Sequence, residues 1–413
     1  MKRSFGAPSL LLVTGAFAAA CGGTATPGST GSGGASPTSS GSASGGAGGA
    51  STTSTSGATS STTGATSSGA GGGGDGVVST FVYVGCNRLS KGDWDPAGNP
   101  SSANLAELTR TFSDVTLLAP VPQHFFFTGD LVLGLDPDTT ILAGQLDAWG
   151  ALYAADPSGI AAKVPVTPLP GNHEMLVKQK VNGTKIELSN PPADPIWTTF
   201  LGGHGFGKHA GNGPTAAGAN PDALADDQSQ LTYSFDDAGV HYVLLNTDTW
   251  TTTPDAATGS TQLGWIAMKW LTADLAAAQA SAAVKHIVVL GHKPIVAPSG
   301  LTTSDEIING TFTGALENLL DTTDKVRGYF CAHAHLWDAR KLPGNRGVTQ
   351  VIAGNGGSSL ETTFTLPYFG FTEVLFHESG KVGVIRHNRP VPVPYNQFPA
   401  LPATPQPEQI VSP

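Results

Sequence analysis

Five short apolar runs divide the chain after residue 77, and each run ends next to a glycine or a polar side chain. The runs cover residues 78–84, 124–128, 164–169, 286–290 and 326–331. Runs of this length that are apolar at consecutive positions are typical of strands buried on both faces. Polar groups gathered where such strands end are the usual arrangement of an α/β active site. The pattern therefore predicts a sheet-based fold with its chemistry at the strand ends.

Helices are predicted between these strands, at residues 104–112, 141–155 and 262–278. In the last segment the apolar positions recur at the spacing of one helix face, as shown by Leu263, Ile266, Trp270, Leu271 and Leu275. Residues 231–236 and 240–246 are two apolar runs around a short turn at Asp237, which predicts an antiparallel pair of strands. The alternation of strands and helices predicts the α/β class.

The first fifth of the chain has a different composition and predicts an exported protein. Lys2 and Arg3 precede an apolar stretch at residues 10–20 that is too short to span a bilayer, so residues 1–20 are interpreted as a signal peptide. Three alanines then precede Cys21, an arrangement that resembles a bacterial lipoprotein cleavage site with Cys21 as the lipidated residue. An ordinary signal peptide cut after a small residue is the alternative. The lipoprotein interpretation predicts a protein anchored to the cell envelope, on its periplasmic or cell-surface side.

The segments at both ends of the apolar region predict a single central domain. Residues 21–76 are almost pure Gly, Ser, Thr and Ala, so they cannot bury enough apolar surface to offset their ordering entropy. We expect a disordered tether with an r.m.s. span of roughly 40 Å. Residues 388–413 are rich in proline and predict an extended tail. The catalytic domain is therefore expected at residues 77–387.

The charge and the cysteines limit the possible partners. The formal net charge is -10 and no basic run is present, which argues against electrostatic capture of nucleic acid. A phosphate substrate stays possible, because a bound metal can supply local positive charge. Of the three cysteines, Cys86 and Cys331 remain if Cys21 carries lipid. These two could pair in an oxidising compartment, but the sequence does not show whether they lie close enough.

Four short blocks follow the apolar runs and carry side chains that bind metals. They are residues 129–130 (Gly-Asp), 171–174 (Gly-Asn-His-Glu), 291–294 (Gly-His-Lys-Pro) and 332–335 (Ala-His-Ala-His). Carboxylate, amide and imidazole groups suit Zn, Fe or Mn. A lone Gly-Asp is usually a turn, and a lone buried histidine is often structural. Turns and structural histidines do not readily account for four such blocks, each after an apolar run.

In these blocks the chain resembles the calcineurin-like metallophosphoesterases, including the purple acid phosphatase branch. That superfamily has Asp-x-His, Gly-Asp, Gly-Asn-His-Asp/Glu, a lone His and Gly-His-x-His in the same order, and the resemblance covers most of residues 80–357. It implies a four-layer α/β/β/α sandwich, in which two mixed sheets are flanked by helices. It also implies a pair of metal ions, with Fe, Zn or Mn expected, and hydrolysis of a phosphate monoester or diester by in-line attack of a metal-activated water.

The resemblance also implies a role for each motif residue. Asp130 would bridge both metals, and His335 would belong to the second site. The first site would be completed by Asn172, His292 and His333. His173 would lie over the phosphate as a general acid or as a stabiliser of developing charge.

Either Glu174 or Asp338 could orient the ligands. Residues 175–227 form a polar insertion that we expect to shape the substrate pocket. Its two histidines, His204 and His209, are not placed in the site.

The first motif departs from the family, because Cys86, Asn87 and Arg88 stand where the family has Asp-x-His. Arg88 cannot ligate a metal, but it could place a positive charge near the phosphate. Cys86 could be a thiolate ligand, a disulfide partner or an apolar filler. Leu133 stands where purple acid phosphatases have a tyrosine, and Ala332 where the family usually has glycine. The departure predicts one tight metal site and one that is weak or absent.

Two other functions stay open at the level of the sequence. The altered first motif would suit a binding or scaffold protein on a degenerate phosphoesterase fold with one metal site lost. Retention of the other six motif residues argues against that alternative. The tether would also permit an enzyme that acts on a lipid or polymer at the membrane, although no exposed amphipathic helix argues for it.

Overall fold

The computed structural model describes residues 75–89, 104–181, 183–254, 261–298, 307–361, 367–391 and 402–413. The chain divides into two units, Met1–Ala70 and Gly71–Pro413, and the described residues all belong to the second. The predicted signal peptide, Cys21 and most of the predicted tether lie outside these residues. None of the helices in the described ranges is long and apolar enough to cross a membrane.

The first sheet contains the three N-terminal apolar runs as parallel neighbours. Its order is β16-β15-β14-β1-β2-β3, with β17 also paired to β15. The strands β1, β2 and β3 run parallel to one another, whereas β14 and β15 are antiparallel additions. Their bounds are β1 (Val77–Val84), β2 (His124–Thr128), β3 (Val166–Leu169), β14 (Tyr368–His377), β15 (Val382–Pro390), β16 (Thr404–Pro405) and β17 (Gln409–Ile410).

The second sheet contains the later apolar runs in the order β12-β13-β11-β10-β7-β6. Its central strands are parallel, and the antiparallel strands β12 and β6 lie at its edges. The pair β6 and β7 confirms the predicted hairpin. The bounds are β6 (Tyr233–Asp237), β7 (Val240–Leu245), β10 (His286–Gly291), β11 (Val326–Cys331), β12 (Trp337–Lys341) and β13 (Thr349–Ala353). Both sheets are therefore mixed, as predicted.

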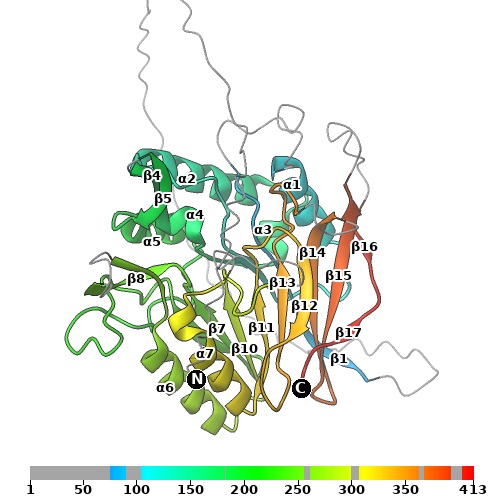
Figure 1. Cartoon of the computed structure of the whole chain (residues 1–413). Coiled ribbons are helices and arrows are strands. Elements are labelled where there is room, and N and C mark those ends of the chain that lie inside the picture. The colour runs from blue at the N-terminus through cyan, green and yellow to red at the C-terminus, as the bar shows by residue number, and fades with distance from the viewer. Residues whose placement is uncertain are drawn as a thin grey trace, which may run out of the picture. The chain divides into compact units, whose positions relative to one another are not determined.

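Helices cover the outer face of each sheet (Figure 1). The described helices are α1 (Asn104–Val115), α2 (Thr139–Ala155), α3 (Ile160–Lys163), α4 (Asn172–Met175), α5 (Ala193–His204), α6 (Met268–Ala280) and α7 (Gly310–Thr322). Two small hairpins complete the described elements, β4 (Leu176–Val181) with β5 (Thr184–Ser189), and β8 (Thr249–Pro254) with β9 (Thr261–Trp265).

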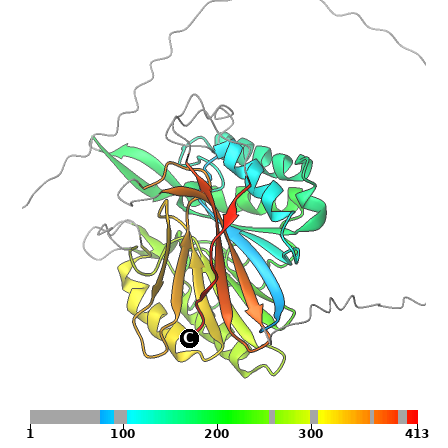
Figure 2. The ribbon, with the colours of Figure 1, turned by 90° about the vertical axis from the view of Figure 1, so that its right-hand side faces the viewer.

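The alternation of side chains along the strands explains the layers. In β1, Phe81 and Tyr83 point into a core shared by both sheets, while Val82 and Val84 point into the core beneath α1, α2 and α5. The shared core also contains Tyr242 of the second sheet. The opposite face of that sheet packs on α6 and α7. Figure 2 shows the two groups of helices on opposite sides of the strands. The predicted four-layer α/β/β/α sandwich is confirmed.

Two expected boundaries differ from the structure. The helix expected from residue 262 begins at Met268, because residues Thr261–Trp265 pair with β8 instead. The domain also does not end at residue 387, since β15 continues to Pro390 and both β16 and β17 pair with it. The C-terminal segment thereby covers an edge that would otherwise expose unpaired backbone groups. Val411 is buried in the core between the sheets, so this part of the predicted tail belongs to the folded domain.

Candidate metal centre

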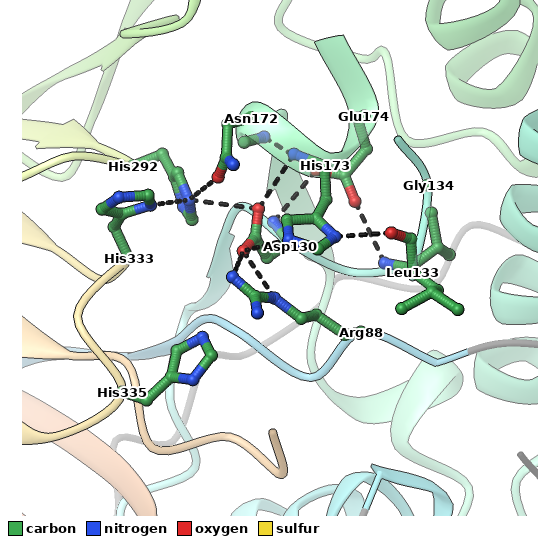
Figure 3. Close-up of polar contacts among 12 residues, drawn as sticks. Arg88, Asp130, Leu133, Gly134, Asn172, His173, Glu174, His292, His333 and His335 are labelled. Carbon is green, nitrogen blue, oxygen red and sulfur yellow. Dashed lines mark hydrogen bonds and ion pairs between the residues drawn. The ribbon is translucent and has the colours of Figure 1, made fainter. Parts of the chain in front are cut away.

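The candidate site is built by loops that follow five strands, three from the first sheet and two from the second. Cys86 follows β1, Asp130 follows β2, Asn172 lies just beyond β3, His292 follows β10 and His333 follows β11. The loops are joined by backbone contacts. The Cys86 N–H donates to the carbonyl of Gly129 at 3.0 Å, and His292 Nδ1 lies 2.8 Å from the carbonyl oxygen of Thr128. The two sheets therefore present their motif residues at one place (Figure 3).

Glycine is required at two positions because the site is crowded. A Cβ atom on Gly129 would lie 2.3 Å from Nδ1 of His292, and one on Gly171 would lie 2.5 Å from Oδ1 of Asp130. Gly129 also has a φ of +89°, which side-chain-bearing residues rarely adopt. These contacts give a physical reason for the glycine that precedes two of the motifs.

Four of the motif residues other than glycine have left-handed backbone conformations. Their φ angles are 59° for Cys86, 56° for Arg88, 55° for Asp130 and 63° for His333. Such conformations each cost of order 1–3 kcal/mol for residues with a Cβ atom, and they concentrate at functional sites. The clustering of four in one place supports a site whose geometry is imposed by function.

Four atoms of metal-binding type converge at the centre. Nε2 of His292 lies 3.1 Å from Oδ1 of Asp130, 3.2 Å from Oδ1 of Asn172 and 3.1 Å from Nδ1 of His333. His292 donates its Nδ1–H to the carbonyl of Thr128, so its Nε2 carries a lone pair. Two oxygens and two imidazole nitrogens suit Zn, Fe or Mn. The residues present therefore fit one metal ion.

The charge of Asp130 agrees with a role as a ligand. Its carboxylate is fully buried, and burial alone would raise its pKa. The neighbouring His173, His292 and Arg88 outweigh that effect and hold the pKa of Asp130 well below its usual value. Asp130 is therefore ionised, as a carboxylate that binds a metal must be.

His173 lies beside these four atoms without being one of them. Its Nδ1–H donates to the carbonyl of Leu133, and its Nε2 lies 3.8 Å from Oδ2 of Asp130. Burial lowers the pKa of His173 to about 3, although Asp130 acts in the opposite direction. The ring is thus fixed at one nitrogen and presents the other to the centre (Figure 3). An adjacent phosphate dianion would raise this pKa and favour a proton on Nε2.

The family comparison agrees with this geometry. The family model described as calcineurin-like phosphoesterase matches residues 92–336. The chain belongs to this family. It is a metal-dependent phosphoesterase.

Solved structures with a similar fold have low sequence identity to this calcineurin-like phosphoesterase. A dimetal phosphatase from Danio rerio is 12% identical with a TM-score of 0.48, and the match covers 82% of this chain and 99% of that one. The structure of PhoD is 13% identical with a TM-score of 0.48, covering 82% and 72%. The 5'-nucleotidase precursor from Thermus thermophilus is 14% identical with a TM-score of 0.37, covering 81% and 54%. A search of the curated proteins found no match.

Cys86 and Arg88 of the altered first motif both lie at the centre of this calcineurin-like phosphoesterase. Arg88 donates to Oδ2 of Asp130 from Nη2 at 2.8 Å and from Nε at 3.0 Å. Cys86 is buried, and its sulfur groups with ligand atoms of Asp130 and His292 that lie within 4.8 Å of one another. Cys331 and Cys86 are both free, so they do not form the disulfide that the sequence left open. For Cys86, the ligand and filler interpretations remain.

His335 is oriented by a hydrogen bond at one of its two nitrogens. It donates Nδ1–H to the carbonyl of Ser359 at 2.7 Å. Its Nε2 is buried and makes no hydrogen bond with the residues that the structure describes. A buried polar atom without a partner is costly and indicates a ligand that is not part of the chain.

Of the two residues that could orient the ligands, Glu174 has the contacts that this role requires. The Glu174 carboxylate accepts backbone N–H groups from Gly171 at 2.8 Å and from Asp130 and Val132 at 3.0 Å each. It therefore joins the loops after β2 and β3 and places Asp130 indirectly. Asp338 instead pairs with Arg340.

Sequence reasoning missed two supporting residues near the centre. Glu187 of β5 accepts from Nδ2 of Asn172 at 3.4 Å, which leaves Oδ1 of Asn172 facing His292. Lys293 pairs with the buried Asp248 at 2.8 Å. No motif marked Glu187, because it lies in the insertion, where polar residues are common. Lys293 could have been identified from the sequence, because it directly follows His292.

The insertion contributes two residues to a cavity that is also lined by Lys293, the neighbour of His292. Leu176 and Glu187 come from the β4–β5 hairpin, and the other lining residues include Leu263, Lys293, Ile308 and Asn309. The two histidines of the insertion make other contacts. His204 lies 3.1 Å from Asp147, and His209 stacks on Phe235 with ring centroids 4.0 Å apart.

Proposed function

We propose that this phosphoesterase hydrolyses phosphate monoesters or diesters at a metal ion held by Asp130, Asn172, His292 and His333. The observation that carries the proposal is the convergence of three ligand atoms on Nε2 of His292, each at 3.1–3.2 Å. When bound, the cation would neutralise phosphate charge and lower the pKa of a water molecule for in-line attack. A scaffold protein would have no reason to retain this arrangement.

The chain's own residues supply the remaining requirements of the reaction. Arg88 places a fixed positive charge beside Asp130, where it can attract a phosphate. His173 is held by the carbonyl of Leu133, so its Nε2 can exchange a proton with the leaving oxygen. Glu174 holds the loops in place by accepting three backbone N–H groups. The cavity lined by Glu187 and Lys293 would receive part of the leaving group.

Metal removal tests this function directly. We expect the purified protein, loaded with Mn²⁺, Zn²⁺ or iron, to hydrolyse p-nitrophenyl phosphate or bis(p-nitrophenyl) phosphate. Chelation should abolish turnover, because no cation would lower the pKa of the attacking water, and addition of the metal should restore it. Turnover is followed by release of nitrophenolate and compared with metal content. A folded, metal-replete protein without turnover on either ester would favour the scaffold alternative.

We also propose that the protein is exported and anchored to the bacterial cell envelope by lipid on Cys21. The support is the basic and apolar start of the chain followed by three alanines and Cys21. Cys21→Ser should release the protein from the membrane fraction and leave turnover unchanged. Cys86→Ser is the matched cysteine control and should stay in the membrane fraction. Equal membrane association of the Cys21→Ser variant and the parent would rule out this anchor.

A further inference from the structure

We propose that Arg88 replaces the second metal ion of this phosphoesterase, so that each chain holds a single metal and the guanidinium supplies the other positive charge at the phosphate. The inference rests on the proposed function only for the position of the phosphate. The number of bound metal ions can be measured independently of turnover.

The two oxygens of the Asp130 carboxylate have different partners. Its Oδ1 faces Nε2 of His292 at 3.1 Å, on the side of Asn172 and His333. Its Oδ2 receives two donors from Arg88, at 2.8 and 3.0 Å. A second metal at this oxygen would have to compete with both donors. In this protein the Arg88 guanidinium donates two N–H groups to Oδ2 (Figure 3).

The backbone of the loop after β1 fixes the position of Arg88. Its backbone N–H donates to the carbonyl of Asp130 at 2.8 Å, and its φ is 56°. The side chain is about one quarter exposed, whereas that of Asp130 is fully buried. Arg88, rather than Asp130, is therefore the member of this ion pair that a phosphate arriving from solvent could reach. It stays charged at every relevant pH.

Too few ligands remain for a second metal. Among the described motif residues, Oδ2 of Asp130 is engaged by Arg88, which leaves the Nε2 atom of His335. Cys86 groups with Asp130 and His292, on the side of the first metal. A second cation would also be repelled by the adjacent guanidinium. The motif residues that the structure describes therefore do not fit a second metal.

This arrangement gives His335 a different role from the one implied by the family. Its Nδ1–H donates to Ser359, and its buried Nε2 accepts from no group of the described chain. Because Nδ1 carries the proton that is donated to the Ser359 carbonyl, Nε2 of this tautomer has a lone pair and is an acceptor. An acceptor beside a fixed cation suits a hydroxyl group of a protonated phosphate or of the substrate. We assign His335 to the substrate.

Metal counting separates the two possibilities. The protein is saturated with Mn²⁺ or Zn²⁺, passed through a desalting column and analysed by mass spectrometry of the elements. We expect one ion per chain in the unmodified protein and in His335→Ala, and loss of the ion in His333→Ala. The double variant Cys86→Asp with Arg88→His should bind a second ion, because it restores the family's first motif. Two tightly bound ions in the unmodified protein, or loss of metal in His335→Ala, would overturn the proposal.

Phosphate binding supplies a second readout that needs no turnover. After chelation, the unmodified protein should still bind inorganic phosphate, because Arg88 does not dissociate. Arg88→Gln should weaken this binding by about 10-fold or more, which corresponds to the loss of a charge-assisted contact. The same variant should keep its single metal ion after reloading. Equal phosphate binding by chelated Arg88→Gln and chelated parent would overturn the role given to the guanidinium. Absence of turnover with one metal bound would count against the proposed function alone.

Discussion

Replacement of His173 by asparagine should lower turnover by ~10²–10⁴-fold while the metal content stays close to that of the parent. His173 is not among the four converging ligand atoms, and its Nδ1 is fixed by the carbonyl of Leu133. Its Nε2 faces the centre at 3.8 Å from Asp130. The asparagine amide can still donate to the carbonyl of Leu133, but it cannot exchange a proton with the leaving oxygen.

The measurement is kcat together with metal content, because the two quantities separate proton transfer from metal binding. His204→Asn is the matched control, since His204 also has a hydrogen-bond partner, Asp147, and is not one of the four converging ligand residues. Its turnover should match the parent. Loss of metal in His173→Asn would show that the role given to His173 is wrong.

Replacement of His292 by alanine should remove both the metal and the turnover. Nε2 of His292 is the atom on which Asp130, Asn172 and His333 converge, so no other side chain can replace it. Mutation of a residue that only orients a ligand typically lowers metal affinity by ~10–100-fold. We expect a larger loss here, because a ligand itself is removed and a buried space is opened.

Metal affinity is measured by competition with a coloured chelator, and folding is checked by thermal unfolding in the chelated state. His286→Ala is the matched control, because His286 is also buried and begins the same strand β10, whose end precedes His292. That variant should bind metal as the parent does. If His292→Ala retained the parent's affinity, the metal centre would not lie at these four residues.

Much of the fold could be predicted because its strands are short and buried on both faces. Residues such as Phe81, Tyr83 and Phe126 lie in apolar runs that no helix or loop would explain equally well. The helix boundary near residue 262 was missed for a physical reason. Residues Thr261–Trp265 satisfy their backbone by pairing with β8, so a tertiary contact overrides their helical periodicity. The pairing of the C-terminal segment with β15 was not predicted, because a proline-rich composition is compatible both with an extended tail and with an edge strand.

The supporting residues of the site were harder to predict than its ligands. Glu174 was one of two candidates, and only the structure shows it accepting three backbone N–H groups. Glu187 carried no motif at all, yet it contacts Asn172 from a hairpin in the insertion. Such contacts depend on where a loop returns in space, which has no local pattern in the sequence.

The chemical identity of the centre follows from the order of residues along the chain. Asp130, Asn172, His292 and His333 each follow an apolar run, and their side chains are metal ligands in any fold that gathers them. Which atoms face one another is a property of the folded domain, because those distances depend on how the two sheets pack. His292 bonds to the carbonyl of Thr128, 164 residues away in the chain. The same packing brings Arg88 onto Oδ2 of Asp130, and so places a guanidinium where the sequence left open a weak or absent metal.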